Sequence, residues 1–96
     1  MPRFITSMKG WALDGTQATP DACASAQGAI VEFCSAKQIK LLRGEANPHK
    51  DGFLFVSVEF MGFAASAEHC WQQEQEIWDS FRQFLANRGY KPRLLF

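Results

Sequence analysis

The stretch Gly52-Phe53-Leu54-Phe55-Val56-Ser57-Val58-Glu59-Phe60-Met61-Gly62-Phe63 is the densest run of strand-forming residues in the chain. Because side chains alternate across a strand, one face of it is the apolar row Leu54, Val56, Val58 and Phe60. The other face has apolar ends and a polar middle, and comprises Phe53, Phe55, Ser57, Glu59, Met61 and Phe63. Burying an unpaired carboxylate is costly. We therefore expect helices to cover the first row, and a ligand or a second protein surface to cover the other.

Length and composition indicate one small globular domain spanning residues 1–96. Hydrophobic residues make up 47% of the chain, and ten basic side chains balance ten acidic ones. A neutral chain has no long-range field for nucleic acid, so a nucleic-acid partner is not expected. The three cysteines form no C-x-x-C pair, which argues against a disulfide framework and a zinc site. We expect no metal and no cofactor.

The chain shows neither an apolar leader segment at Met1–Phe4 nor an apolar run close to the roughly 20 residues that span a membrane. The sequence therefore predicts a cytoplasmic protein with no membrane role.

Two elements are predicted before the hairpin that leads to the central strand. Mixed alternation over Arg3–Leu13 favours a first strand, followed by a turn at Asp14-Gly15. Thr19-Pro20-Asp21 combines an N-cap residue, a proline and an acid, so it predicts the start of a helix that runs to about Lys37.

The second strand is expected over Ile39–Asn47, with Leu42, Gly44 and Ala46 on the helix side. Polar residues from Asn47 to Gly52 then form a hairpin turn. This register puts Arg43 across from, or diagonal to, Ser57 and Glu59 on the other side of the sheet.

After the central strand, Ser66 is the expected N-cap of a second helix that ends near Gly89. Its apolar stripe comprises Ala67, Cys70, Trp71, Ile77, Trp78, Phe81 and Leu85. Tyr90–Phe96 closes the chain as an edge strand because Pro92 lacks a ladder donor. The order predicts an α+β fold, a ferredoxin-like βαββαβ sandwich with a four-stranded antiparallel sheet and both helices on one face.

No catalytic constellation is evident. Glu74 falls inside the apolar stripe of the second helix, so it is either a carboxylate at the edge of the stripe or a buried acid that needs an Arg, His or Trp donor. His49 and His69 are expected at the surface, and the three cysteines on core-facing stripes are expected to be inert.

The segment Lys50–Val58 resembles the RNP1 motif of RNA-recognition domains at Gly52, Phe53, Phe55 and Val56. Asp51, Leu54 and Val58 depart from that motif. The resemblance implies single-stranded RNA stacked on Phe53 and Phe55. The order of elements also resembles the dimeric α+β barrel proteins, a group that includes small cofactor-free monooxygenases. That resemblance implies a dimer that encloses a pocket for a small apolar or aromatic ligand.

The favoured hypothesis is a non-enzymatic homodimeric binding or accessory protein, of the kind carried on mobile genetic elements. Its contact or ligand site is the helix-free sheet face, with Arg43, Phe53, Phe55, Ser57, Glu59, Met61 and Phe63 as site residues. The alternatives are a ligand pocket or enzyme of the barrel type, and an RNA platform.

Overall fold

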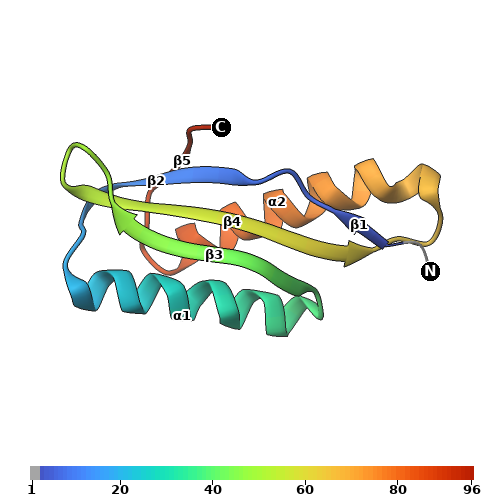
Figure 1. Ribbon diagram of the computed structural model, residues 1–96, viewed down its shortest axis with the longest axis horizontal. Coiled ribbons are helices and arrows are strands. Elements are labelled where there is room, and N and C mark those ends of the chain that lie inside the picture. The colour runs from blue at the N-terminus through green and yellow to red at the C-terminus, as the bar shows by residue number, and fades with distance from the viewer. Residues whose placement is uncertain (1–2) are drawn as a thin grey trace.

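A computed structural model describes residues 3–96, and it shows an α+β fold with two α-helices and a five-stranded antiparallel sheet (Figure 1). The strands are β1 (Arg3–Ile5), β2 (Lys9–Gln17), β3 (Lys40–Pro48), β4 (Phe53–Phe63) and β5 (Pro92–Leu94). The helices are α1 (Pro20–Lys37), the 3-10 turn η1 (Ala67–His69) and α2 (Cys70–Asn87). Within residues 3–96, neither helix combines the length and the apolar character needed to cross a membrane.

β4 is the central strand, as its composition predicts. It pairs with β3 along one edge and with both β1 and β2 along the other, while β5 pairs with β2. The outer edge of β3 carries charged residues, Pro48 and a register shift between Leu41 and Arg43, all of which discourage pairing with another strand.

The expected strand Arg3–Leu13 is interrupted, which is why the sheet has five strands where four were predicted. The ladder with β4 breaks at Thr6–Met8 and resumes at Lys9. The break shifts the alternation, because Phe4 pairs with Gly62 on the helix side while Lys9 and Trp11 pair with Val58 and Val56. Thr6 still holds β4, since its hydroxyl accepts from the Phe60 N–H at 2.9 Å.

The turn expected at Asp14-Gly15 is instead an irregularity within β2, which continues to Gln17. Gly15 adopts a φ of 81°, which glycine reaches without a steric cost. The helix start is confirmed: the Thr19 hydroxyl accepts from the Ala22 N–H at 3.1 Å, and Pro20 opens α1.

Both helices pack on the face of the sheet that carries Leu54, Val56, Val58 and Phe60, all of which are fully buried. An aromatic cluster joins the two helices to the sheet. The ring centroids of Phe33 in α1 and Phe81 in α2 are 5.2 Å apart, and those of Phe60 in β4 and Trp78 in α2 are 5.0 Å apart. α1 contributes a buried stripe at Ala26, Ile30, Phe33 and Cys34.

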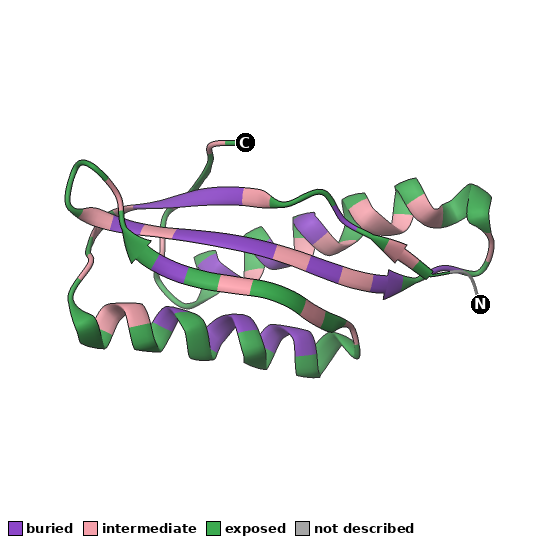
Figure 2. Cartoon of the chain, in the orientation of Figure 1, coloured by how far each residue is buried: buried purple, intermediate pink, exposed green. Residues whose placement is uncertain are grey.

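The stripe predicted for α2 is only half right. Trp78, Phe81 and Leu85 are buried, but Trp71 is 72% exposed. Figure 2 shows the N-terminal turns of α2 as exposed or intermediate only. Trp71 lies close to the direction of Trp78 around the helix, since seven residues make nearly two turns. The burial prediction for Trp71 is wrong. Helical periodicity gives the direction of a side chain around the helix, but it does not show whether the sheet extends beneath that turn.

The side predicted for Leu42 is also wrong. The register of β3 against β4 shifts between Leu41, which pairs with Phe60, and Arg43, which pairs with Glu59. This irregularity puts Leu41 against the core and leaves Leu42 39% exposed.

Candidate functional site: the helix-free face of the sheet

The sheet face opposite the helices, here called the helix-free face, holds the residues that the sequence singles out. β4 contributes Phe53, Phe55, Ser57, Glu59, Met61 and Phe63, which alternate with the buried core row. Strand pairing places Gly10, Ala12, Ile5 and Arg3 beside them from β2 and β1, and Arg43, Glu45 and Asn47 from β3. The polar middle of β4 continues into β3 at Arg43 and Glu45, and its apolar ends continue into β2 and β1 at Ala12 and Ile5. Polar side chains also flank the apolar ends, namely Arg3, Lys40 and Asn47.

One end of the helix-free face is aromatic. His49 stacks on Phe55 with centroids 5.5 Å apart, and Phe96 lies 6.1 Å from Phe55. Phe96 comes to lie here because the Gly10 N–H donates to its carbonyl at 3.2 Å and the Leu95 N–H donates to the Gly10 carbonyl. A Cβ on Gly10 would lie 2.5 Å from the Phe96 ring, so only glycine admits this contact.

The opposite end of the face carries exposed apolar side chains. Ile5 pairs with Met61 and is 62% exposed, and Phe63 and Met8 are exposed as well. Sequence reasoning missed Ile5, Met8 and Phe96, because their positions depend on the break in the first strand and on where the last residues lie.

The middle of the face is small and polar. Arg43 is directly opposite Glu59, and Glu45 is directly opposite Ser57, so the predicted placement of Arg43 across from Glu59 is confirmed. Ser57 is buried beside Gly10, which has no side chain. The Arg43 guanidinium donates to the Met8 sulfur at 3.5 Å, and among residues 3–96 it makes no ion pair.

Arg93 and Asp14 form a bidentate ion pair at the β5 edge, with nitrogen–oxygen distances of 2.9 and 3.0 Å. The hydrogen bonds from Arg93 lower the pKa of the Asp14 carboxyl. This pair fixes β5 to β2 and leaves Arg93 without a free charge for a ligand.

Glu74 lies off the helix-free face and is partly buried. Its Oε1 accepts from the Trp78 indole at 3.4 Å and from the Ser7 N–H at 3.2 Å. A Trp indole is one of the donors expected from the sequence for a buried Glu74, beside Arg and His. The Ser7 amide is free for this bond because the ladder is broken there, so Glu74 ties α2 to the strand break.

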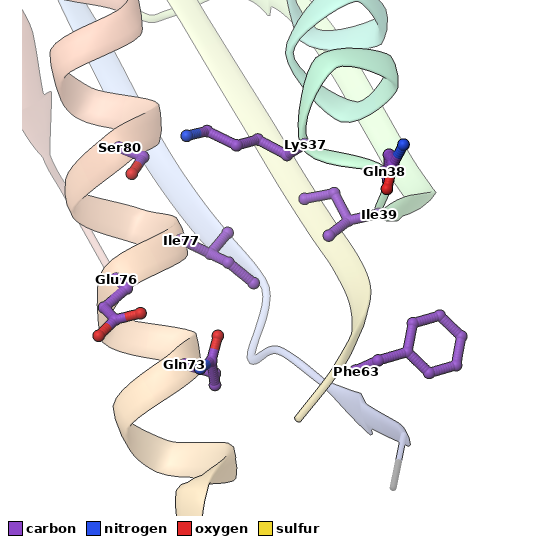
Figure 3. A pocket seen from close by; sticks show the side chains of 8 residues that line it. All are labelled: Lys37, Gln38, Ile39, Phe63, Gln73, Glu76, Ile77 and Ser80. Carbon is purple, nitrogen blue, oxygen red and sulfur yellow. The ribbon is translucent and has the colours of Figure 1, made fainter. Parts of the chain in front are cut away.

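A cleft with a volume of about 410 Å³ opens between the end of α1 and the first turns of α2 (Figure 3). Lys37 and Ile39 line one side, Glu76 and Ile77 the other, and Phe63 lies at the end of β4 with its ring turned away from α2. Across residues 3–96, no three His, Cys, Asp or Glu side chains come together as a metal site.

Comparison of this chain with protein-family models, with curated proteins and with solved structures finds no match.

Proposed function

We propose that this protein is a non-enzymatic homodimeric binding protein, in which the helix-free faces of two copies pack against each other. The observation that carries the proposal is the symmetry of that face about Val58. Along β4, Ser57 and Glu59, Phe55 and Met61, and Phe53 and Phe63 lie at equal distances on either side of Val58.

A twofold axis that runs between the sheets, across the strands and over Val58 therefore brings apolar ends against apolar ends. Phe55 meets the partner's Met61, and Phe53 meets the partner's Phe63. β1 and β2 follow the same rule, because Ala12 is beside Phe55 and Ile5 is beside Met61. On β3, Lys40 beside Met61 meets the partner's Asn47, which is beside Phe55. Facing sheets cross at roughly 30°, which displaces the ends sideways but keeps the central residues near the axis.

Charge complementarity supports the same axis. Gly44 is opposite Val58, so on β3 the axis passes over Gly44 and places Arg43 over the partner's Glu45. Each dimer then contains this pair twice, once on each side of the axis. An arginine without an ion pair in the described monomer thereby gains a carboxylate partner.

The area of the face is at the lower end of what a dimer needs. The five strands hold 3, 9, 9, 11 and 3 residues, and at about 3.3 Å per residue and about 4.8 Å between strands they cover on the order of 550 Å². Stable interfaces bury roughly 800 Å² per partner, and the smallest of ordinary size about 600 Å².

We assign the fold to the ferredoxin-like group, with an interrupted first strand. The free cysteines agree with a reducing compartment such as the cytoplasm.

A second candidate function, a ligand pocket within the dimer, is favoured by the small residues Gly10, Ala12 and Ser57 between bulkier ends. Two such faces leave a hollow lined by Ser57, Glu59 and Arg43, as in the dimeric α+β barrel proteins. The RNA alternative is less favoured, because His49 and Phe96 pack against Phe55 and Asp14 holds Arg93.

The test is a pair of matched charge insertions, Ile5→Asp on the face and Val31→Asp on α1. Both side chains are exposed, by 62% and 57%, so neither change removes core packing. Sedimentation velocity is expected to show a monomer for Ile5→Asp and a dimer for Val31→Asp. If Ile5→Asp is still a dimer, the helix-free face is not the dimer interface.

A further inference from the structure

A second groove lies on the helix side of the sheet, away from the helix-free face. It runs between the β2–β5 edge and α2 and has a volume of about 250 Å³. The residues that matter here are Lys9, Trp11, Trp78, Asp79, Arg82 and Leu94. Because β5 is only 3 residues long, it leaves the groove open beside Lys9.

Two buried tryptophans and an exposed leucine form the apolar part of this groove. The Trp11 and Trp78 rings are 6.4 Å apart and inclined by 40°, and both line the groove. Leu94, on the edge strand, adds an exposed aliphatic side chain. Pockets for small ligands are built in this way, from apolar walls with a few polar groups.

Two cations provide the polar groups. The Lys9 ammonium lies over the Trp78 ring, 5.7 Å from its centre, and Arg82 lines the same groove from α2. Neither side chain makes an ion pair within the described part of the chain, residues 3–96. Asp79 is the one carboxylate in the lining, so the groove keeps a net positive charge.

The indole N–H of Trp11 is the third polar feature. Trp11 is 4% exposed, and its Nε1 is buried without a hydrogen-bond acceptor among residues 3–96. A buried donor without an acceptor is costly and uncommon in folded proteins. An oxygen atom that reaches this nitrogen would supply the acceptor.

We propose that this groove binds a small carboxylate with a flat apolar body, such as an aromatic acid. Lys9 and Arg82 hold the carboxylate, the Trp11 indole donates to it, and the apolar body lies against Pro92 and Leu94. Where the ligand carries an ammonium beside the carboxylate, Asp79 receives it, so aromatic acids and aromatic amino acids share this chemistry.

The experiment titrates the protein with phenylacetate, with L-phenylalanine and with uncharged phenylacetamide, and follows the indole N–H signals by NMR. Saturable binding of phenylacetate or L-phenylalanine is expected to shift the Trp11 signal and leave that of Trp71 unchanged, since Trp71 is exposed and outside the lining. Tighter binding of L-phenylalanine than of phenylacetate would show that Asp79 receives the ammonium, and tighter binding of phenylacetate would show that it does not. Phenylacetamide is expected to bind at least tenfold more weakly, because it lacks the charge.

The Lys9→Met, Arg82→Met double variant is expected to lower carboxylate affinity at least tenfold. Lys50→Met, a matched loss of a cation from the exposed hairpin loop, is expected to leave it unchanged. The proposal is overturned if neither phenylacetate nor L-phenylalanine reaches saturation below about 10 mM, because a dissociation constant that high is weaker than ordinary specific binding. Equal affinity for phenylacetamide, or a shift confined to Trp71, would also overturn it.

Discussion

Arg43 and Glu59 lie directly opposite each other in the β3–β4 ladder, yet Arg43 donates to the sulfur of Met8 and not to the Glu59 carboxylate. A thioether is a weak acceptor. Arg43 can therefore change partner at little cost when a second copy brings the carboxylate of Glu45 over it.

A charge exchange tests this partner. Arg43→Glu places two acids over each other in the proposed dimer, and Glu45→Arg places two arginines over each other, so each variant alone is expected to dissociate at least tenfold more readily. An equimolar mixture of the two variants restores opposite charges at both sites. Mass measurement of the mixture is expected to recover the heterodimer, and a mixture that stays monomeric would contradict the axis over Val58.

The ladder pair itself is tested by a double-mutant cycle of Arg43→Ala and Glu59→Ala, read by dimer dissociation. We expect the two changes to be non-additive by more than about 0.5 kcal/mol, because burial of the face removes the water that screens both charges. Additive effects would show that Arg43 and Glu59 act independently in the dimer.

Trp78 and Trp71 form a matched pair on α2. Trp78 is buried against Trp11, Phe60 and Phe81, so Trp78→Ala is expected to lower the free energy of unfolding by about 3–5 kcal/mol. Trp71 is exposed, so Trp71→Ala is expected to change it by less than about 0.5 kcal/mol. Urea titration measures both, and similar losses at the two positions would mean that Trp71 is covered in solution.

Two glycines provide another matched comparison. Gly10→Ala sets a Cβ within 3 Å of the Phe96 and Phe55 rings, so we expect a loss of roughly 1–3 kcal/mol and a weaker dimer. Gly28 lies in α1 with open space at its Cβ, so Gly28→Ala is expected to stabilise the protein by about 0.5–1 kcal/mol. Thermal unfolding of both variants checks this, and a neutral Gly10→Ala would show that Phe96 does not pack on the face.

The thiol of Cys34 gives a dependence on pH. Burial raises the pKa of Cys34 from 9.0 to about 11. The folded protein therefore keeps the thiol protonated while the unfolded chain loses the proton above pH 9, so this stabilisation is complete below pH 9 and is lost as pH rises through 11. The loss is about 2–3 kcal/mol.

Urea titration between pH 8 and about pH 11 is expected to show that loss in the native chain and in Cys70→Ala but not in Cys34→Ala. The other titratable groups are common to all three proteins, so their contributions to the pH dependence cancel in the comparison. An identical pH dependence in Cys34→Ala would mean that the thiol is not buried in solution.

The sequence predicts the elements of this fold where local signals are strong. Thr19-Pro20 sets the start of α1, and the alternating rows of β4 identify both faces of the sheet, because cap chemistry and strand period depend on neighbouring residues only. The register that puts Arg43 opposite Glu59 follows from the same rows.

The errors arise where a distant element decides the outcome. The break at Thr6–Met8 and the register shift near Leu42 depend on how β1 and β3 meet β4, and each changes which face a side chain occupies. Trp71 is exposed because the sheet does not extend beneath it, which its helical direction cannot reveal. Phe96 joins the candidate site because backbone hydrogen bonds between Gly10 and the last two residues bring it beside Phe55.

The proposed function requires two copies of this chain to pair through the helix-free face, and the mass of the protein in solution decides whether they do. Sedimentation equilibrium at about 10 μM, well above the dissociation constants of ordinary stable dimers, is expected to give twice the chain mass of 10.8 kDa. A single species at the chain mass would show that the helix-free faces do not pair.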